Sequence, residues 1–145
     1  NKAQQNSSLV SKVTKDNKKV EEKKSNFFKQ DSQINKRMKI KLERGMIRPE
    51  SKLDLHGKNL KDAKKTLSEF IKACIEKNIR CILVITGKKK TINGAKGLIR
   101  ENLPLWLKEN ELFNYILFHC YATKKDGDDG ARYILLRKKD KVFYG

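Results

Sequence analysis

The sequence predicts an α/β fold: a two-layer sandwich in which the order β-α-β-α-β-β builds a four-stranded mixed sheet, preceded by a basic N-terminal helix. Three observations lead to this prediction. Residues 81–85 form an unbroken apolar run, which is typical of a central strand. Apolar residues recur every three or four positions between residues 60 and 74, as on one face of a helix. Residues 115–121 alternate between two sides, as in a strand.

The charge of the chain limits the partners that we expect. Its 145 residues include 35 Lys and Arg against 17 Asp and Glu, a formal net charge of +18. Such an excess favours a polyanion, meaning DNA, RNA or the ribosome, and lysine richness that serves only solubility is the alternative. No apolar run is long enough to cross a bilayer, and residues 1–5 hold no apolar leader core. We therefore expect a cytoplasmic protein without a membrane partner, and we expect it to be a monomer.

The three cysteines lie in apolar runs and are odd in number, so the sequence predicts free thiols in a reducing compartment and no disulfide framework. These residues are Cys74, Cys81 and Cys120.

The composition divides the chain into three parts. Residues 1–30 are lysine-rich, polar and aperiodic, which predicts a flexible basic tail. Residues 31–49 are expected to form a helix, capped by Ser32 and stopped by Gly45, and a linker. Its apolar stripe is narrow, so we expect this helix to lean on the domain or on a partner without entering the core. The stripe consists of Ile34, Met38 and Leu42. Residues 50–140 form the predicted domain.

Within the domain, strands and helices are predicted to alternate. Strands are expected at residues 53–57, 80–86, 113–121 and 131–137, and helices at residues 60–77 and 95–109. Pro104 should bend or break the second helix. Because crossovers between parallel strands are right-handed, both helices should cover one face of the sheet. The other face should stay open, lined by Tyr115, His119, Tyr121 and either Arg132 or Tyr133.

Asp54 and His56 are the most informative pair in the sequence. Strand side chains alternate, so residues two positions apart should point to the same side at the carboxyl end of the first strand. Open α/β sheets bind ligands at such strand ends. Gly57 then allows a sharp turn, and Asn59 can cap the following helix. The alternative is that both residues are ordinary polar groups on a solvated face.

In order along the chain, four motifs resemble the Smr domain, the small MutS-related family that includes stand-alone bacterial proteins. They are Asp54-Leu55-His56-Gly57, Thr86-Gly87-Lys88, Gly97-Leu98-Ile99-Arg100 and the turn from Gly127 to Ala131. Lys89 and Asp128 stand where the family usually has glycine.

This resemblance implies an endonuclease that hydrolyses phosphodiester bonds, nicking DNA or cutting RNA on stalled ribosomes. Asp54 and His56 would be catalytic, and Asp54 would also be the ligand of a divalent cation such as Mg²⁺ or Mn²⁺ if one is needed. The nucleic-acid-binding residues would be Gly87, Lys88, Lys89, Lys90 and Arg100. The competing interpretation is a non-catalytic adaptor that docks on nucleic acid or the ribosome.

For individual residues, the alternative to a functional role is a purely structural one. Arg100 would be a solvated or ion-paired helix residue, and the lysine triplet would belong to a loop that is merely mobile. His119 is expected to be a satisfied strand histidine, and Trp106 a core residue.

Overall fold

The computed structural model of the chain describes residues 36–87 and 97–142. The predicted basic tail, the Ser32 cap and the lysine triplet at residues 88–90 lie outside the described residues. In chain order the elements are α2 (Lys36–Glu43), β1 (Ser51–Asp54), α3 (Leu60–Glu76), β2 (Cys81–Ile85), α4 (Leu98–Trp106), α5 (Asn110–Phe113), β3 (Ile116–Tyr121) and β4 (Ala131–Leu136). Short 3₁₀ turns, η2 (Lys124–Asp126) and η3 (Asp128–Gly130), join β3 to β4, and η4 (Lys139–Lys141) follows β4.

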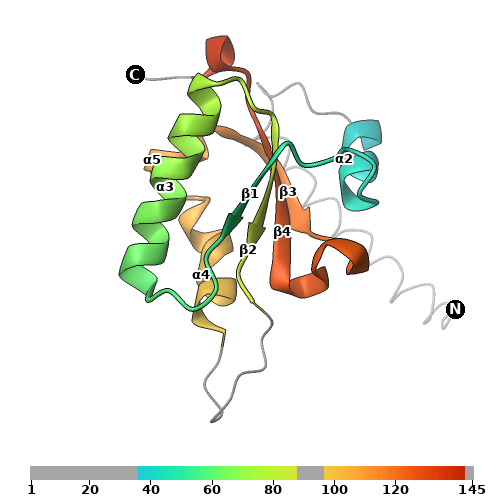
Figure 1. The fold of residues 1–145 in the computed structure, drawn as a ribbon. Helices are drawn as coiled ribbons and strands as arrows, with labels where there is room; N and C mark the ends of the chain where they lie inside the picture. Colours follow the sequence, from blue (N-terminus) through green and yellow to red (C-terminus); the bar gives the residue numbers. More distant parts are fainter. Residues whose placement is uncertain (1–35, 88–96, 143–145) are drawn as a thin grey trace, which may run out of the picture. The chain divides into compact units, whose positions relative to one another are not determined.

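The predicted fold class is confirmed. The strands form one four-stranded sheet in the order β1-β2-β4-β3, in which β1 and β2 are parallel and the other neighbours are antiparallel. The helices α3 and α4 both cover the same face of this sheet, as right-handed crossovers require (Figure 1).

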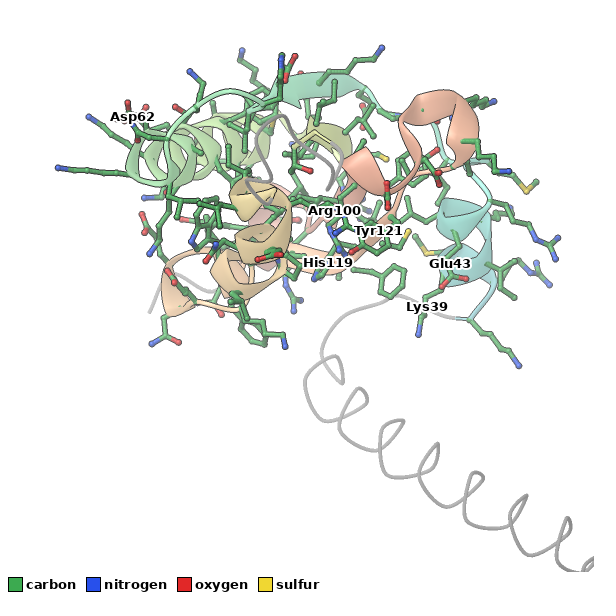
Figure 2. All side chains as sticks on the ribbon, turned by 90° about the horizontal axis from the view of Figure 1, so that it is seen from below. Lys39, Glu43, Asp62, Arg100, His119 and Tyr121 are labelled. Atoms are coloured by element: carbon green, nitrogen blue, oxygen red, sulfur yellow. The ribbon has the colours of Figure 1, made fainter. Side chains whose placement is uncertain are left out.

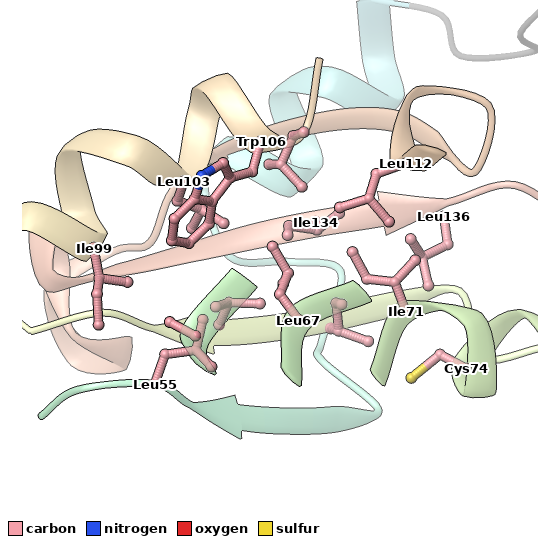
Figure 3. Packing of buried hydrophobic residues seen from close by; sticks show 14 of the residues in the cluster. Leu55, Leu67, Ile71, Cys74, Ile99, Leu103, Trp106, Leu112, Ile134 and Leu136 are labelled. Atoms are coloured by element: carbon pink, nitrogen blue, oxygen red, sulfur yellow. The ribbon is translucent and has the colours of Figure 1, made fainter. Parts of the chain in front are cut away.

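Helix α3 forms where the sequence combines a cap with a regular apolar stripe. The side chain of Asn59 accepts a hydrogen bond from the backbone N–H of Asp62 at 2.8 Å, which satisfies one of the free donors of the first turn. The stripe is buried against Leu55 of the β1 end and Ile134 of β4 (Figure 3). It comprises Ala63, Leu67, Ile71, Cys74 and Ile75. Trp106 of α4 completes this helix-side core, so its expected role in packing is confirmed.

Pro104 lies inside α4 and does not end it. The helix continues to Trp106 although Pro104 cannot donate a hydrogen bond to the carbonyl of Arg100. Residues 95–109 were predicted as one helix, whereas the chain forms α4 and then the single-turn helix α5.

The prediction of an open second face is wrong, because α2 covers part of it. Leu42 of α2 is fully buried in a second core, in which Leu83, Tyr133 and Leu135 of the sheet also take part. Lys39 lies over the ring of Phe118 in β3 at 4.9 Å. The expectation that this helix would stay outside the core is therefore also wrong (Figure 1).

A β-bulge in β3 changes which of its side chains face the helices. Ile116 pairs with Leu136, but Phe118 pairs with Leu135, so Leu117 is an extra residue. Beyond the bulge, His119 pairs with Ile134 and Tyr121 pairs with Arg132. Directly paired residues share a face, so His119, Tyr121 and Arg132 lie on the helix side of the sheet and not on the predicted open face. Tyr115 packs against the helix-side core, and Tyr133 is buried on the α2 side.

The linker after α2 is fixed to the η2 turn by a polar network of Arg48, Asp126 and Tyr133. Arg48 donates to both carboxylate oxygens of Asp126, at 2.8 and 3.0 Å, and to the carbonyl of Gly45 at 2.9 Å. The Tyr133 hydroxyl also donates to Asp126. Gly45 has a φ of +73°, and a Cβ there would lie 2.8 Å from the Tyr133 hydroxyl oxygen, so this turn requires glycine.

Candidate active site and nucleic-acid interface

The carboxyl ends of β1 and β2 bring two of the sequence motifs together. Asp54 pairs with Ile85 in parallel register, and the backbone N–H of Leu55 donates to the carbonyl of Ile85 at 2.7 Å. The chain after β1 therefore runs beside the chain after β2. A Cβ added to Gly87 would lie 3.5 Å from the Cβ of His56, so Gly87 lies beside the His56 side chain.

Asp54 and His56 form a hydrogen-bonded pair, as their spacing suggests. One carboxylate oxygen of Asp54, Oδ1, accepts from the backbone N–H of His56 at 3.0 Å and lies 3.0 Å from Nδ1 of its ring. The backbone hydrogen bond from His56 is the main reason why the pKa of Asp54 lies below its usual value. An ionised Asp54 holds the proton of His56 on Nδ1, which leaves Nε2 free to accept a proton.

The pair is open to a large substrate. The side chains of His56 and Asp54 are 69% and 53% exposed, respectively. A polymer can therefore reach both groups without any movement of the described residues, which is the accessibility that an enzyme acting on nucleic acid needs.

The turn before β4 is attached to the same strand end. The carbonyl of Gly130 accepts from the backbone N–H of Thr86 at 2.9 Å and of Gly87 at 3.0 Å. Asp128, which stands where the family usually has glycine, adopts a φ of +56°. Aspartate visits this left-handed region more readily than most residues, so the turn keeps its backbone despite the replacement.

Arg100 joins α4 to this turn. Its Nε donates to the carbonyl of Asp129 at 2.9 Å, and one terminal nitrogen lies 3.1 Å from the Asp129 carboxylate. The Arg100 side chain is 17% exposed. Arg100 is therefore ion-paired, which was the alternative to its predicted role in binding nucleic acid, and its charge is partly compensated by Asp129.

Arg132, His119 and Tyr121 form a group at the same end of the sheet; the sequence pattern placed His119, Tyr121 and either Arg132 or Tyr133 on one face, but on the wrong one and without their contacts. Arg132 donates to Nδ1 of His119 at 2.8 Å, and its guanidinium lies 4.4 Å from the centre of the Tyr121 ring. Arg100 lies 5.4 Å from that ring, and Figure 2 shows Arg100, Tyr121 and His119 close together. The bulge in β3 determines which face these side chains occupy, and the sequence pattern does not reveal the bulge.

The described residues do not provide a multidentate metal site. Within residues 36–87 and 97–142, no group of three or more His, Cys, Asp or Glu side chains is arranged to hold a metal ion. Asp54 contributes one carboxylate, and its Oδ1 already accepts hydrogen bonds from His56. Because this donor set does not fit a protein-built divalent-cation site, we derive no catalytic step through a metal.

A family model for the Smr domain matches residues 53–137, so the chain belongs to the Smr domain family. Ribosome rescue factor SmrB of Vibrio cholerae is 33% identical over 110 residues, which cover 76% of this chain and 54% of that protein. Ribosome rescue factor SmrB of Tolumonas auensis is 36% identical over 98 residues, or 68% of this chain and 51% of that protein. The chain thus spans about half the length of the curated relatives that it matches.

Two solved structures have the same fold. YdaL, a stand-alone small MutS-related protein from Escherichia coli, superposes with a TM-score of 0.53 at 28% identity, covering 60% of this chain and 64% of that one. The Smr domain of Thermus thermophilus MutS2 gives a TM-score of 0.51 at 16% identity, covering 60% of this chain and 98% of that one. In the described part of the chain, none of the helices has the length and apolar character needed to cross a membrane.

Proposed function

We propose that the chain is an endonuclease that hydrolyses phosphodiester bonds in RNA, and that it works in the cytoplasm in association with the ribosome. The observation that carries the catalytic part is the exposed Asp54–His56 pair, which lies beside Gly87 at the carboxyl ends of two parallel strands. The choice of RNA and the ribosome is supported by relatives named ribosome rescue factors. The net charge of +18 supports a polyanionic partner.

In this proposal His56 is the general base and Asp54 orients it. The Nε2 atom of His56 takes a proton from the attacking water molecule as the water oxygen forms a bond to phosphorus and the bond to the leaving oxygen breaks. The protonated imidazole can then return this proton to the leaving oxygen. Asp54 stabilises the imidazolium through the contact at Nδ1.

Binding is assigned to the cations and backbone around this pair. Lys88, Lys89 and Lys90 directly follow Gly87 in the sequence. They are proposed to contact backbone phosphates, with Gly87 allowing close approach. Arg100 is proposed to contribute through the part of its charge that Asp129 does not compensate.

The experiment compares cleavage by the wild-type chain, Asp54→Asn, His56→Gln and the double variant. Substrates are an end-labelled RNA and a DNA of the same sequence, each with and without a chelator. We expect each single variant to lose about 10²-fold or more of the RNA cleavage rate, with similar affinity. The double variant should lose no more than the single variants, because the two residues act as one unit.

Asp140→Asn is the matched control, since it removes an exposed carboxylate from η4, beyond the opposite end of β4. Wild-type cleavage rates in both single variants, with intact binding, would refute catalysis by this pair and favour the adaptor. Cleavage of DNA alone would refute the assignment of RNA. Loss of activity with chelator would show that a divalent cation takes part.

A further inference from the structure

Arg132 presents a buried positive charge without an acidic partner. The residue is 9% exposed, yet no Asp or Glu forms an ion pair with it anywhere in residues 36–87 and 97–142. Burial, with the nearby positive charge of Arg100, holds the pKa of Arg132 below its usual value, although the group stays charged. Removing a charge from water costs several kcal/mol, so proteins normally pair such a group. An anion that binds here would supply the missing partner.

His119 holds Arg132 without neutralising it. Burial and the positive charge of Arg132 lower the pKa of His119 to about 4, so its imidazole is neutral near pH 7. A neutral Nδ1 can accept the hydrogen bond from Arg132, which fixes the direction of the guanidinium. A carboxylate at this position would fix it equally well but would cancel its charge.

Tyr121 brings a second cation close to the first. Its ring lies beneath both guanidinium groups, at 4.4 Å from Arg132 and 5.4 Å from Arg100, and the residue is 46% exposed. The ring face attracts both cations and offsets part of their repulsion. Because Asp129 already compensates Arg100, Arg132 carries the charge that remains available.

The group lies at the same end of the sheet as Asp54 and His56. Leu53, Val84, Arg132 and Tyr121 are consecutive partners in one row across the four strands. Three steps between strands make this row about 14 Å long. Asp54 alternates with Leu53 and therefore lies on the opposite face of the sheet from Arg132 and Tyr121. A nucleic-acid strand that passes over the strand ends from one face to the other would meet Tyr121 and Arg132 a few nucleotides away from His56.

We propose that Arg132, held by His119 and Tyr121, binds a backbone phosphate of single-stranded RNA a few nucleotides away from the bond at Asp54 and His56. This subsite rests on the proposed function for its substrate but not for its chemistry. Arg132 would determine affinity and placement of the strand, and His119 would act as a positioning residue.

The test measures binding of a fluorescein-labelled oligouridine to the full chain by fluorescence anisotropy, over a range of salt concentrations. The variants are Arg132→Gln, His119→Glu and His119→Gln. Lys141→Gln is the control, because it removes an exposed cation from η4, beyond the opposite end of β4. Arg132→Gln, His119→Glu and this control each change the net charge by the same amount, so a difference among them reflects position.

We expect Arg132→Gln and His119→Glu to weaken binding about 3- to 10-fold and to reduce the salt slope by about 0.7, the value of one lost phosphate contact. His119→Gln, which keeps a neutral acceptor, should bind close to the wild-type level. Arg132→Gln should not lower the melting temperature, because it removes an unpaired buried charge. A purely structural Arg132 would instead lower the melting temperature and leave affinity unchanged.

The subsite is overturned if Arg132→Gln weakens binding no more than Lys141→Gln, if His119→Glu and His119→Gln behave alike, or if the wild-type chain does not bind the probe. Cleavage is read separately. Binding that depends on Arg132 in a chain that cuts no RNA would refute the proposed function but support the subsite. If cleavage depends on His56 but binding does not change on replacing Arg132, the proposed function is supported and the subsite is refuted.

Discussion

Asp126 makes the clearest pH-dependent contribution to stability among the described residues. Its hydrogen bonds from Arg48 lower its pKa to about 2, and the hydroxyl of Tyr133 adds to this effect. The folded-state pKa lies below that of the unfolded chain, so ionised Asp126 stabilises the fold above about pH 4. This stabilisation is lost as the pH falls from about 4 towards 2.

We therefore expect Asp126→Asn to lower the free energy of unfolding by about 1–2 kcal/mol at pH 7, a value discounted because the Arg48 side chain is 48% exposed. The difference from the wild type should shrink at acidic pH, near the folded pKa. Urea unfolding at both pH values measures this, with Asp140→Asn as control. An equal loss at both pH values would contradict an electrostatic role for Asp126.

The residues of the candidate site differ in how well the sequence reveals them. Asp54 and His56 can be predicted to meet, because residues two apart in a strand share a side whatever the fold around them. Their position beside Gly87 can also be predicted, once β1 and β2 are taken to be parallel neighbours. Arg132 and His119 are 13 positions apart, and their contact depends on the register of two antiparallel strands. One extra residue in β3 decides that register.

Among the secondary-structure elements, α3 and β2 are predicted best because their patterns are long and regular. The bulge in β3 cannot be predicted from the sequence. Ile116, Leu117 and Phe118 are all apolar, so the alternation of polar and apolar residues does not show which of them faces which side of the sheet. The sequence pattern placed helix α2 outside the core for a different reason. A single buried leucine, supported by partly buried neighbours, is enough to anchor a helix of eight residues.

Helix α2 gives a direct test of this second core. Leu42→Ala should lower the free energy of unfolding by about 2–5 kcal/mol, because Leu42 is fully buried between α2 and the sheet. Ile40→Ala on the same helix should cost much less, since Ile40 is 36% exposed. Urea unfolding of both variants provides the measurement. Equally small losses would show that α2 only rests on the surface.

Across the 145 residues, charge is divided between the domain and the segment that precedes it. Residues 1–26 contain seven Lys against three Asp and Glu. Phosphate contacts release counterions whatever the base sequence, so these lysines should add affinity without specificity. Removing residues 1–26 should weaken RNA binding and flatten its salt dependence, as measured by anisotropy titrations. Unchanged affinity and slope would mean that these lysines make no phosphate contacts.

The strand order has a consequence for how the chain is made. The last of these four strands to be synthesised, β4, lies between β2 and β3 and is the only described partner of β3. Until residues 131–136 leave the ribosome, β2 has one free edge and β3 has two. Unpaired edges invite association with other chains. The sheet can therefore close only after residue 136 has been synthesised, and a chain cut short before residue 131 would be prone to aggregate even though it holds both Asp54 and His56.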